Sequence, residues 1–366
     1  MAFISRLIER LLYPSPDLIV HSILERSYKS DLMMFITDII KIREAHVAVF
    51  SADESAPSWL RRQYAFQARN IYQLKNCEVI LPVGGICCGG FWLQESFGHY
   101  RNVLIDVSQW RKRNFLFRRT HVVKDSCYYL RTTGYYHFVL EALPALLHVL
   151  KRIPDITVIV SNTMRHKEYL FINQYLQILR EQGLVKKTLT VEGARIQCAC
   201  LAFTQQEEKS GFVHKDDIEL LRKTFLPTIT RASEQKKLFI TRRNAKRAFD
   251  NQEAIGVYLE TQGFICIELE SLSIVEQIQL FVQAEVVVAN HGAGLANLVW
   301  CSQCNLVVEL FSPMFLNDCY FRLARSMDIN YQSVVASKRA GDNWGQVETE
   351  KLNLALGKQE SSTCLT

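Results

Sequence analysis

The residues best placed for chemistry in this sequence directly follow short apolar runs that predict buried strands. The sharpest segment is EVVVANHGAGLANLVW, where His291, Gly292 and Gly294 come after such a run. Glycines at the start of a helix let the backbone approach a ligand, and the N–H groups there favour a phosphate. A tight turn without a ligand would use the same glycines. The polar ring of His291 favours a ligand site, because ligands bind at the carboxyl ends of strands in parallel sheets.

An acidic residue stands in the next predicted strand. Glu309 lies 15 residues after Gly294, in NLVVELF. A carboxylate at that strand end can accept hydrogen bonds from both ribose hydroxyls of a nucleotide. A dinucleotide fingerprint would have a third glycine where Asn297 stands, which weakens a dehydrogenase interpretation. The alternative role for Glu309 is a solvated strand end.

Arginines cluster in ITRRNAKRAFDNQEAI, directly after another predicted strand. Arg242, Arg243 and Arg247 could clamp a diphosphate through bidentate guanidinium hydrogen bonds, which suits a leaving group that gains negative charge. A solvated basic loop is the alternative. Because this loop and HGAGL follow strands of one predicted sheet, both are expected at the same edge of it.

A candidate base lies in TGYYHFVLEALPALLHVL. His137 and Glu141 are four residues apart and would share one face of a helix, while the other face supplies leucines to the core. A histidine, with an unperturbed pKa of about 6.5, can deprotonate a hydroxyl near neutral pH. The alternative is a histidine with a structural role only.

The remaining motifs do not predict a metal centre. Cys301 and Cys304 have a zinc-like spacing, but Cys198 and Cys200, which could complete the set, are expected in a strand that points into the core. Cys87–Cys88, within GGICCGG, is expected in a turn. Neither Asp-x-Asp, GxSxG nor HExxH occurs. We therefore expect no metal and no other cofactor.

Length and composition bound the class of protein. At about 150 residues per domain, 366 residues predict two domains, and 48% hydrophobic with 22% charged residues excludes global disorder. The net charge of +6 suits an anionic ligand or acidic lipid, but it is too scattered for nucleic acid. The 11 cysteines have irregular spacings, which indicates a reduced, intracellular protein.

The N-terminus predicts neither a cleavable signal peptide nor a membrane span. Arg6, Glu9 and Arg10 interrupt its apolar residues, and no run of 18 apolar residues follows. We expect a cytoplasmic protein with a peripheral contact to the cytoplasmic membrane. Residues 3–12 could form an amphipathic helix on that membrane, or an ordinary core helix.

Alternating strand and helix patterns predict an α/β fold. In the N-terminal half the expected strands are 46–50, 77–83, 102–107, 157–161 and 197–203, and the expected helices are 134–152 and 165–183. A charged segment from residue 215 to 225, with the polar stretch after it, is expected to connect the domains. Beyond it, strands are expected at 237–241, 264–269, 285–290 and 305–311, with helices at 251–262, 273–283 and 317–327. These strands predict a parallel, doubly wound sheet, and the tail from about Ala336 is expected to be poorly ordered.

Taken together, YYHFVLEALPAL, ITRRNAKRAFDNQEAI and VVVANHGAGLANLVWCSQCNLVVELFSP resemble glycosyltransferase family 61 over about residues 120–330. This is the DUF563 group, which includes bacterial capsule and lipopolysaccharide transferases and eukaryotic xylosyl- and N-acetylglucosaminyltransferases. The resemblance implies a GT-B architecture of two Rossmann-like domains facing a cleft, inversion at the anomeric carbon and no metal requirement. The residues it implies for the site are His137 and Glu141, Arg242 or Arg243 with Arg247, the loop His291, Gly292, Ala293 and Gly294, and Glu309.

From these patterns we expect an inverting glycosyltransferase that moves a sugar from a nucleotide-sugar donor, UDP-linked, to a hydroxyl of a polysaccharide, lipopolysaccharide or glycolipid. Residues 1–215 would form the acceptor-side domain, 216–345 the donor-binding domain and 346–366 a polar tail. Within the site, His137, Glu141 and His291 all remain candidates for the base. The alternatives are an NAD-dependent oxidoreductase using HGAG and Glu309, or a non-catalytic nucleotide- or glycan-binding protein.

Overall fold

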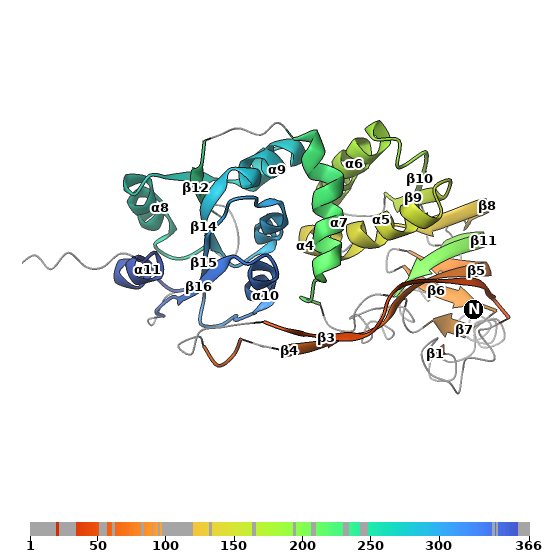
Figure 1. The fold of residues 1–366 in the computed structure, drawn as a ribbon, viewed down its shortest axis with the longest axis horizontal. Helices are drawn as coiled ribbons and strands as arrows, with labels where there is room; N and C mark the ends of the chain where they lie inside the picture. The colour runs from red at the N-terminus through yellow and green to blue at the C-terminus, as the bar shows by residue number, and fades with distance from the viewer. Residues whose placement is uncertain are drawn as a thin grey trace, which may run out of the picture. The chain divides into compact units, whose positions relative to one another are not determined.

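The fold of the chain is given by a computed structural model. It describes residues 20–21, 34–50, 57–60, 63–81, 84–89, 91–93, 96, 120–131, 134–162, 166–192, 195–205, 210–229, 234–241, 248–338, 341 and 343–357. The chain divides into two compact units, and each holds a β-sheet with helices, so the predicted α/β class is confirmed (Figure 1). Unit 1 comprises Met1–Ala48, Ala65–Thr133 and Glu141–Ser210, and unit 2 comprises Val49–Tyr64, Gly134–Leu140 and Gly211–Thr366. The domain boundary between residues 215 and 216 stays a prediction.

Unit 1 is built on a mixed sheet. Its order, in the part of the chain that is described, is β1-β7-β6-β5-β11-β8-β9-β10, with β2 paired to β5. The strands are β1 (Val20–His21), β2 (Ile36–Arg43), β5 (Arg69–Ile80), β6 (Gly85–Cys88), β7 (Phe91–Leu93), β8 (Thr120–Tyr129), β9 (Thr157–Ser161), β10 (Lys187–Val191) and β11 (Arg195–Thr204). Strands β11, β8, β9 and β10 run parallel, whereas β5 pairs antiparallel with β6 and β11. A separate two-stranded sheet pairs β3 (His46–Val49) with β4 (Gln63–Phe66).

Helices connect the parallel strands of unit 1. Between β8 and β9 the chain forms α4 (Tyr135–His137), the π-helix η3 (Phe138–Ala142) and α5 (Leu143–Arg152), and α6 (His166–Glu181) joins β9 to β10. Every residue of β9 is buried, as expected for a strand covered on both faces. The helices and strands predicted at 134–152, 165–183, 157–161 and 197–203 are confirmed. The strand predicted at 102–107 and the amphipathic helix at 3–12 lie outside the described residues.

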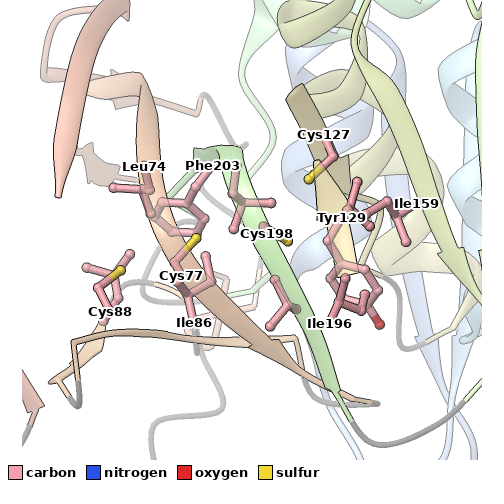
Figure 2. Close-up of a cluster of buried hydrophobic side chains, with 14 of the residues drawn as sticks. Leu74, Cys77, Ile86, Cys88, Cys127, Tyr129, Ile159, Ile196, Cys198 and Phe203 are labelled. Carbon is pink, nitrogen blue, oxygen red and sulfur yellow. The ribbon is translucent and has the colours of Figure 1, made fainter. Parts of the chain in front are cut away.

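Cysteines line the core of the unit 1 sheet (Figure 2). Cys77 lies opposite Cys88 on β6 and opposite Cys198 on β11, while Cys127 is buried on β8. The hydrogen bond from Cys88, together with burial, raises the pKa of the Cys77 thiol, and Cys198 and burial act likewise on Cys127. Cys77 and Cys127 therefore remain protonated thiols, and all four side chains pack as small apolar groups.

Two cysteine predictions need correction. GGICCGG forms strand β6 rather than a turn, and the turns lie at its ends, where Gly84 and Gly89 have φ of 76° and 56°. Cys198 is fully buried, as expected, but a bulge separates it from Cys200, which is only half-buried. The irregular register breaks the strict alternation from which both were predicted to face the core.

Unit 2 holds a parallel five-stranded sheet in the order β13-β12-β14-β15-β16. Its strands are β12 (Lys236–Ile240), β13 (Phe264–Ile267), β14 (Ala284–Asn290), β15 (Leu306–Phe311) and β16 (Asn330–Val335). The helices are α7 (Lys215–Phe225), α8 (Gln252–Thr261), α9 (Ile274–Val282), α10 (Cys319–Ser326) and α11 (Thr349–Ala355), with 3₁₀ helices η4 (Leu226–Thr228), η5 (Leu269–Ser271) and η6 (Ala293–Trp300). The predicted parallel, doubly wound arrangement is confirmed for this sheet.

Three parts of unit 2 differ from the prediction. Strand β16 was not expected, because its sequence NYQSVV mixes polar with apolar residues at the sheet edge. The predicted poor order of the tail is wrong for α11, which inserts a fully buried Leu352 into the core. The predicted connection at 215–225 is α7, a packed helix whose Phe225 ring meets the Trp300 ring edge-on, with ring centres 5.4 Å apart.

Candidate functional site

The order of strands in unit 2 reverses between β12 and β14. From β12 the chain first adds β13 on one side and then crosses to add β14, β15 and β16 on the other. Such a reversal is the topological switch point, and ligands of open α/β sheets bind in the crevice outside the carboxyl ends of the strands there. The segments that leave these two ends are the arginine loop after Thr241 and the HGAG loop after Asn290.

The HGAG loop turns sharply out of the sheet. The N–H of His291 donates to the carbonyl of Leu310 at 2.9 Å, which continues the pairing with β15, and Gly292 is extended before η6 begins at Ala293. A Cβ at Gly294 would stand 2.9 Å from Leu269 Cδ1 and 3.5 Å from Ile240 Cγ2. Gly294 therefore packs closely against its neighbours, and a Cβ there would require the Leu269 side chain to shift. The phosphate contact of this loop stays a prediction.

His291 and Glu309 form a buried pair at this loop. Nδ1 of His291 lies 2.5 Å from Oε1 of Glu309, and the Tyr331 hydroxyl donates to Oε2 of Glu309 at 2.6 Å. The Glu309 side chain has no exposed surface, whereas that of His291 is 13% exposed. Burial raises the pKa of the Glu309 carboxyl, although the hydrogen bonds from His291 and Tyr331 oppose this effect. Burial also raises the pKa of Tyr331, so its hydroxyl stays a donor.

The predicted ribose contact of Glu309 stays a prediction, and the structure shows that the carboxylate is engaged within the protein. Its carboxylate is completely buried, and each oxygen already has a protein partner. The residue faces the ring of His291 instead of the crevice, because it lies within β15 and not at its end. Glu309 therefore holds and polarises His291, and any contact with a ligand passes through that ring.

Aromatic side chains enclose the ring of His291. It stacks on Phe311 with ring centres 5.2 Å apart, and Phe315 and Tyr320 lie at 5.2 Å and 5.5 Å. This apolar surrounding strengthens the electrostatic interaction between His291 and Glu309 by excluding water. Phe311, Phe315 and Tyr320 therefore hold the imidazole ring of His291 in one orientation.

The YYH segment belongs to unit 2 through Tyr135 and Tyr136. The Tyr135 hydroxyl donates to Oδ1 of Asn297 at 2.7 Å, in the helix that follows HGAG. Asn297 is fully buried and also accepts from the Trp300 indole, while its amide donates to Gln277. Asn297 therefore anchors three elements, which explains why a glycine of the dinucleotide type would not serve at this position.

His137 is connected to His291 by a row of aromatic rings. The ring of Tyr136 meets His137 edge-on at 5.4 Å and Tyr320 at 5.6 Å, and Tyr320 in turn contacts His291. The structure thus brings both predicted histidines into one unit. The prediction had placed His137 on the N-terminal side, but its neighbours tie it to the unit that carries HGAG.

Glu141 follows His137 within a wide turn of the helix. Residues Phe138–Ala142 form a π-helix, in which backbone hydrogen bonds span five residues, so the shared face expected for an α-helical pair is altered. Glu141 belongs to unit 1, where its Oε1 accepts a hydrogen bond from the Ser210 hydroxyl at 2.8 Å. Single π-helical turns are frequent at functional sites.

Arg242, Arg243 and Arg247 lie outside the described residues, so the phosphate clamp stays a prediction. The residues after them have structural roles. The carboxylate of Asp250 accepts hydrogen bonds from the backbone N–H groups of Asn343, Trp344 and Gly345 at 2.8–3.2 Å. Burial disfavours its ionised form, but these hydrogen bonds outweigh burial and lower the pKa of Asp250. The motif therefore fastens the start of α8 to the C-terminal segment.

The pair Cys301 and Cys304 lies at the end of η6. Burial raises the pKa of Cys301, while the hydrogen bond from Cys301 lowers the pKa of Cys304. Among the described residues, no third side chain of a type that ligates metals joins this pair. Arg222 of α7 donates to the carbonyls of Val299 and Cys301, which satisfies the free carbonyl groups at this helix end.

Several residues that organise the site were not predicted. Tyr331 lies on the unexpected strand β16, and only its pairing with Glu309 in space reveals its role. Asp318 and Arg322 form a buried ion pair of 2.5 Å on α10, and the Arg322 guanidinium also donates to the carbonyl of Gly211. The spacing of four residues between Asp318 and Arg322 was a signal that the sequence did contain.

The fold and this loop define a doubly wound α/β protein with a candidate ligand site at the switch point of its second sheet. Residues 135–308 match the family model described as Glycosyltransferase 61. The resemblance predicted from the three motifs is thereby confirmed over these residues. Sugar transfer is the reaction of that family.

A search of curated proteins gave no match. In the part of the chain that the structure describes, no helix is both long and apolar enough to cross a membrane.

Proposed function

We propose that the protein is an inverting, metal-independent glycosyltransferase of GT-B architecture. It transfers a sugar from a nucleotide-sugar donor, UDP-linked, to a hydroxyl of a polysaccharide, lipopolysaccharide or glycolipid. The observation that carries this proposal is the HGAG loop at the switch point of unit 2, with His291 held by the buried Glu309. The family match over residues 135–308 supports the reaction class.

The donor half of the proposed site uses groups suited to an anionic leaving group. Backbone N–H groups of Gly292, Ala293 and Gly294 at the start of η6 favour a phosphate. The imidazole of His291, fixed through its Nδ1 atom, would donate from Nε2 to the diphosphate. Arg242 or Arg243 together with Arg247 would neutralise the charge that develops as the bond to the sugar breaks.

The acceptor half needs one base, for which we propose His137. A sugar hydroxyl becomes an effective nucleophile only as a nearby group accepts its proton. The half-buried His137 lies next to the wide π-helical turn and belongs to the same unit as the donor loop. Glu141, already bound by Ser210, and His291 are the other candidates.

The acceptor and location complete the proposal. We propose a cytoplasmic protein with peripheral contact to the cytoplasmic membrane, where capsule or lipopolysaccharide precursors are assembled. Its net charge of +6 supports an approach to acidic lipid.

The direct test of the function is a screen of sugar nucleotides in which released nucleotide is measured by mass spectrometry, with and without glycan acceptors. Reduction of a nicotinamide cofactor without sugar transfer would contradict it.

Sugar transfer is expected to survive an excess of EDTA. The sequence lacks Asp-x-Asp, and the arginine loop with HGAG can neutralise the diphosphate without a metal ion. The measurement is the initial rate of nucleotide release before and after chelation. Loss of the rate, with recovery on addition of manganese or magnesium, would contradict the proposed architecture.

Replacing Arg247 by alanine is expected to weaken UDP binding about tenfold, because a charge-assisted hydrogen bond to the diphosphate is lost. The neighbouring substitution Lys246→Ala is the matched control, since it removes a similar charge without a bidentate donor. Calorimetric titration with UDP measures both. Equal affinity of the two variants would move the clamp to Arg242 and Arg243.

A further inference from the structure

A network of buried polar side chains joins the two strands at the switch point of unit 2. Nε2 of Gln252, the first residue of α8, donates to the Thr241 hydroxyl at 3.2 Å. Oε1 of Gln252 accepts from Nδ2 of Asn290 at 2.6 Å. Thr241 follows β12, Asn290 ends β14, and all three side chains are at most 7% exposed.

The network fixes the orientation of the Asn290 amide. Because Nε2 of Gln252 donates to Thr241, its Oε1 faces Asn290 and requires a donor there. Oδ1 of Asn290 therefore points away from Gln252. Within the described residues this oxygen is buried and has no hydrogen-bond partner. A buried acceptor without a partner is unfavourable, and native proteins keep such groups rarely.

The place of this oxygen indicates the kind of group that would satisfy it. It lies at the carboxyl end of β14, directly before the HGAG loop and below the first turn of α8. The side chain of Asn251 does not cap that helix, because it bonds to the backbone of Val347 instead. The amide oxygen of Asn290 would repel phosphate oxygens. Its partner must therefore be a hydrogen-bond donor on a part of the ligand that lies next to the anionic phosphates.

We propose that Asn290 Oδ1 is a hydroxyl-binding subsite that accepts a hydrogen bond from the donor nucleotide sugar, at a ribose or sugar hydroxyl. This inference rests on the proposed function, since it names one contact of the same donor. Gln252 and Thr241 act as positioning residues that hold the amide oxygen toward the ligand. The subsite distinguishes ligands that carry this hydroxyl from ligands that lack it, whatever their charge.

The test compares Asn290→Ala with Thr241→Val in the full chain. Thr241→Val removes the far end of the network with little change of shape and leaves the Asn290–Gln252 bond in place. Calorimetry measures the affinity for UDP, 2′-deoxy-UDP, 3′-deoxy-UDP and UDP-glucose. Loss of one net hydrogen bond corresponds to a change of about tenfold.

We expect the wild-type chain to bind one deoxy analogue about tenfold more weakly than UDP, and Asn290→Ala to bind that analogue and UDP equally. Thr241→Val, in which the Gln252 amide is no longer fixed by the threonine hydroxyl, is expected to show a smaller preference than the wild-type chain. If the sugar supplies the hydroxyl, Asn290→Ala instead retains its affinity for UDP and loses the extra affinity for UDP-glucose. The same ligand preferences in all three proteins would overturn the subsite alone. Absence of any nucleotide binding by the wild-type chain would overturn the proposed function together with it.

Discussion

Replacing His137 by alanine is expected to reduce sugar transfer at saturating donor by about a hundredfold, while the affinity for nucleotide stays nearly unchanged. The reduction follows from the loss of the proton acceptor for the sugar hydroxyl, since general bases contribute about 10²–10⁴-fold. The donor affinity is preserved because the proposed donor contacts come from HGAG and the arginine loop. The measurement is the rate of both proteins at saturating donor from pH 5.5 to 9.

The companion variant is Glu141→Gln, which is expected to keep partial activity. It changes the charge next to the base but preserves an acceptor for the Ser210 hydroxyl. If His137→Ala keeps more than about a tenth of the wild-type rate, the role of base passes to Glu141 or His291. A near-complete loss in Glu141→Gln, with a normal rate in His137→Ala, would select Glu141.

The elements of the chain could be predicted where their patterns are local. Strand β9 was predicted with its observed bounds, because its run of buried β-branched residues is complete within the segment. The role of α7 was not predictable in the same way. Its charged face suggested a connection, whereas its buried side depends on Trp300, which lies far away in the sequence.

The site could be predicted as a set of residues but not as a geometry. His291 and Glu309 were both selected from their places near strand ends, yet the pair was assigned to two separate ligand contacts. The register of β14, β15 and β16 determines which face of β15 carries Glu309 and places Tyr331 beside it. Register between strands that are far apart in sequence is set by packing, which a single sequence does not display.

The second large effect is expected for His291→Ala, which should lower the rate of transfer about a hundredfold. In the proposed function Nε2 of His291 donates to the leaving diphosphate, and removal of one such preorganised donor costs about 10²–10³ in kcat. His291→Gln is the milder companion variant, because glutamine fills more of the space of the imidazole ring than alanine does and leaves the packing of the surrounding aromatic residues intact. An unchanged rate in His291→Ala would remove this residue from the reaction.

The substitution Glu309→Gln distinguishes two possible roles of His291: Nε2 donates a hydrogen bond to the leaving group, or Nε2 accepts a proton as a base. The Tyr331 hydroxyl donates to Oε2 of Glu309, so it is expected to hold the oxygen of the new amide and turn the amide nitrogen toward His291. Nδ1 of His291 then accepts a hydrogen bond, which places the ring proton on Nε2. A donor at Nε2 survives this substitution, whereas a base at Nε2 is lost.

The pH dependence of transfer provides the final distinction. While the Glu309–His291 pair holds its shared proton, Nε2 carries hydrogen whether the proton resides on the ring or on the carboxyl. Burial raises the pKa of Glu309, so the pair retains this proton to higher pH than a solvated carboxyl would, and its loss removes the donor. Transfer by the wild-type chain is therefore expected to fall as the pH rises, and Glu309→Gln, in which the ring proton stays on Nε2, is expected to lack that fall. Among the described residues, the other ionisable groups near the pair are Asp318, Cys319, Tyr320 and Tyr331, and they are unchanged in the variant. If Glu309→Gln instead loses as much activity as His291→Ala, His291 acts as a base and the assignment of His137 is wrong.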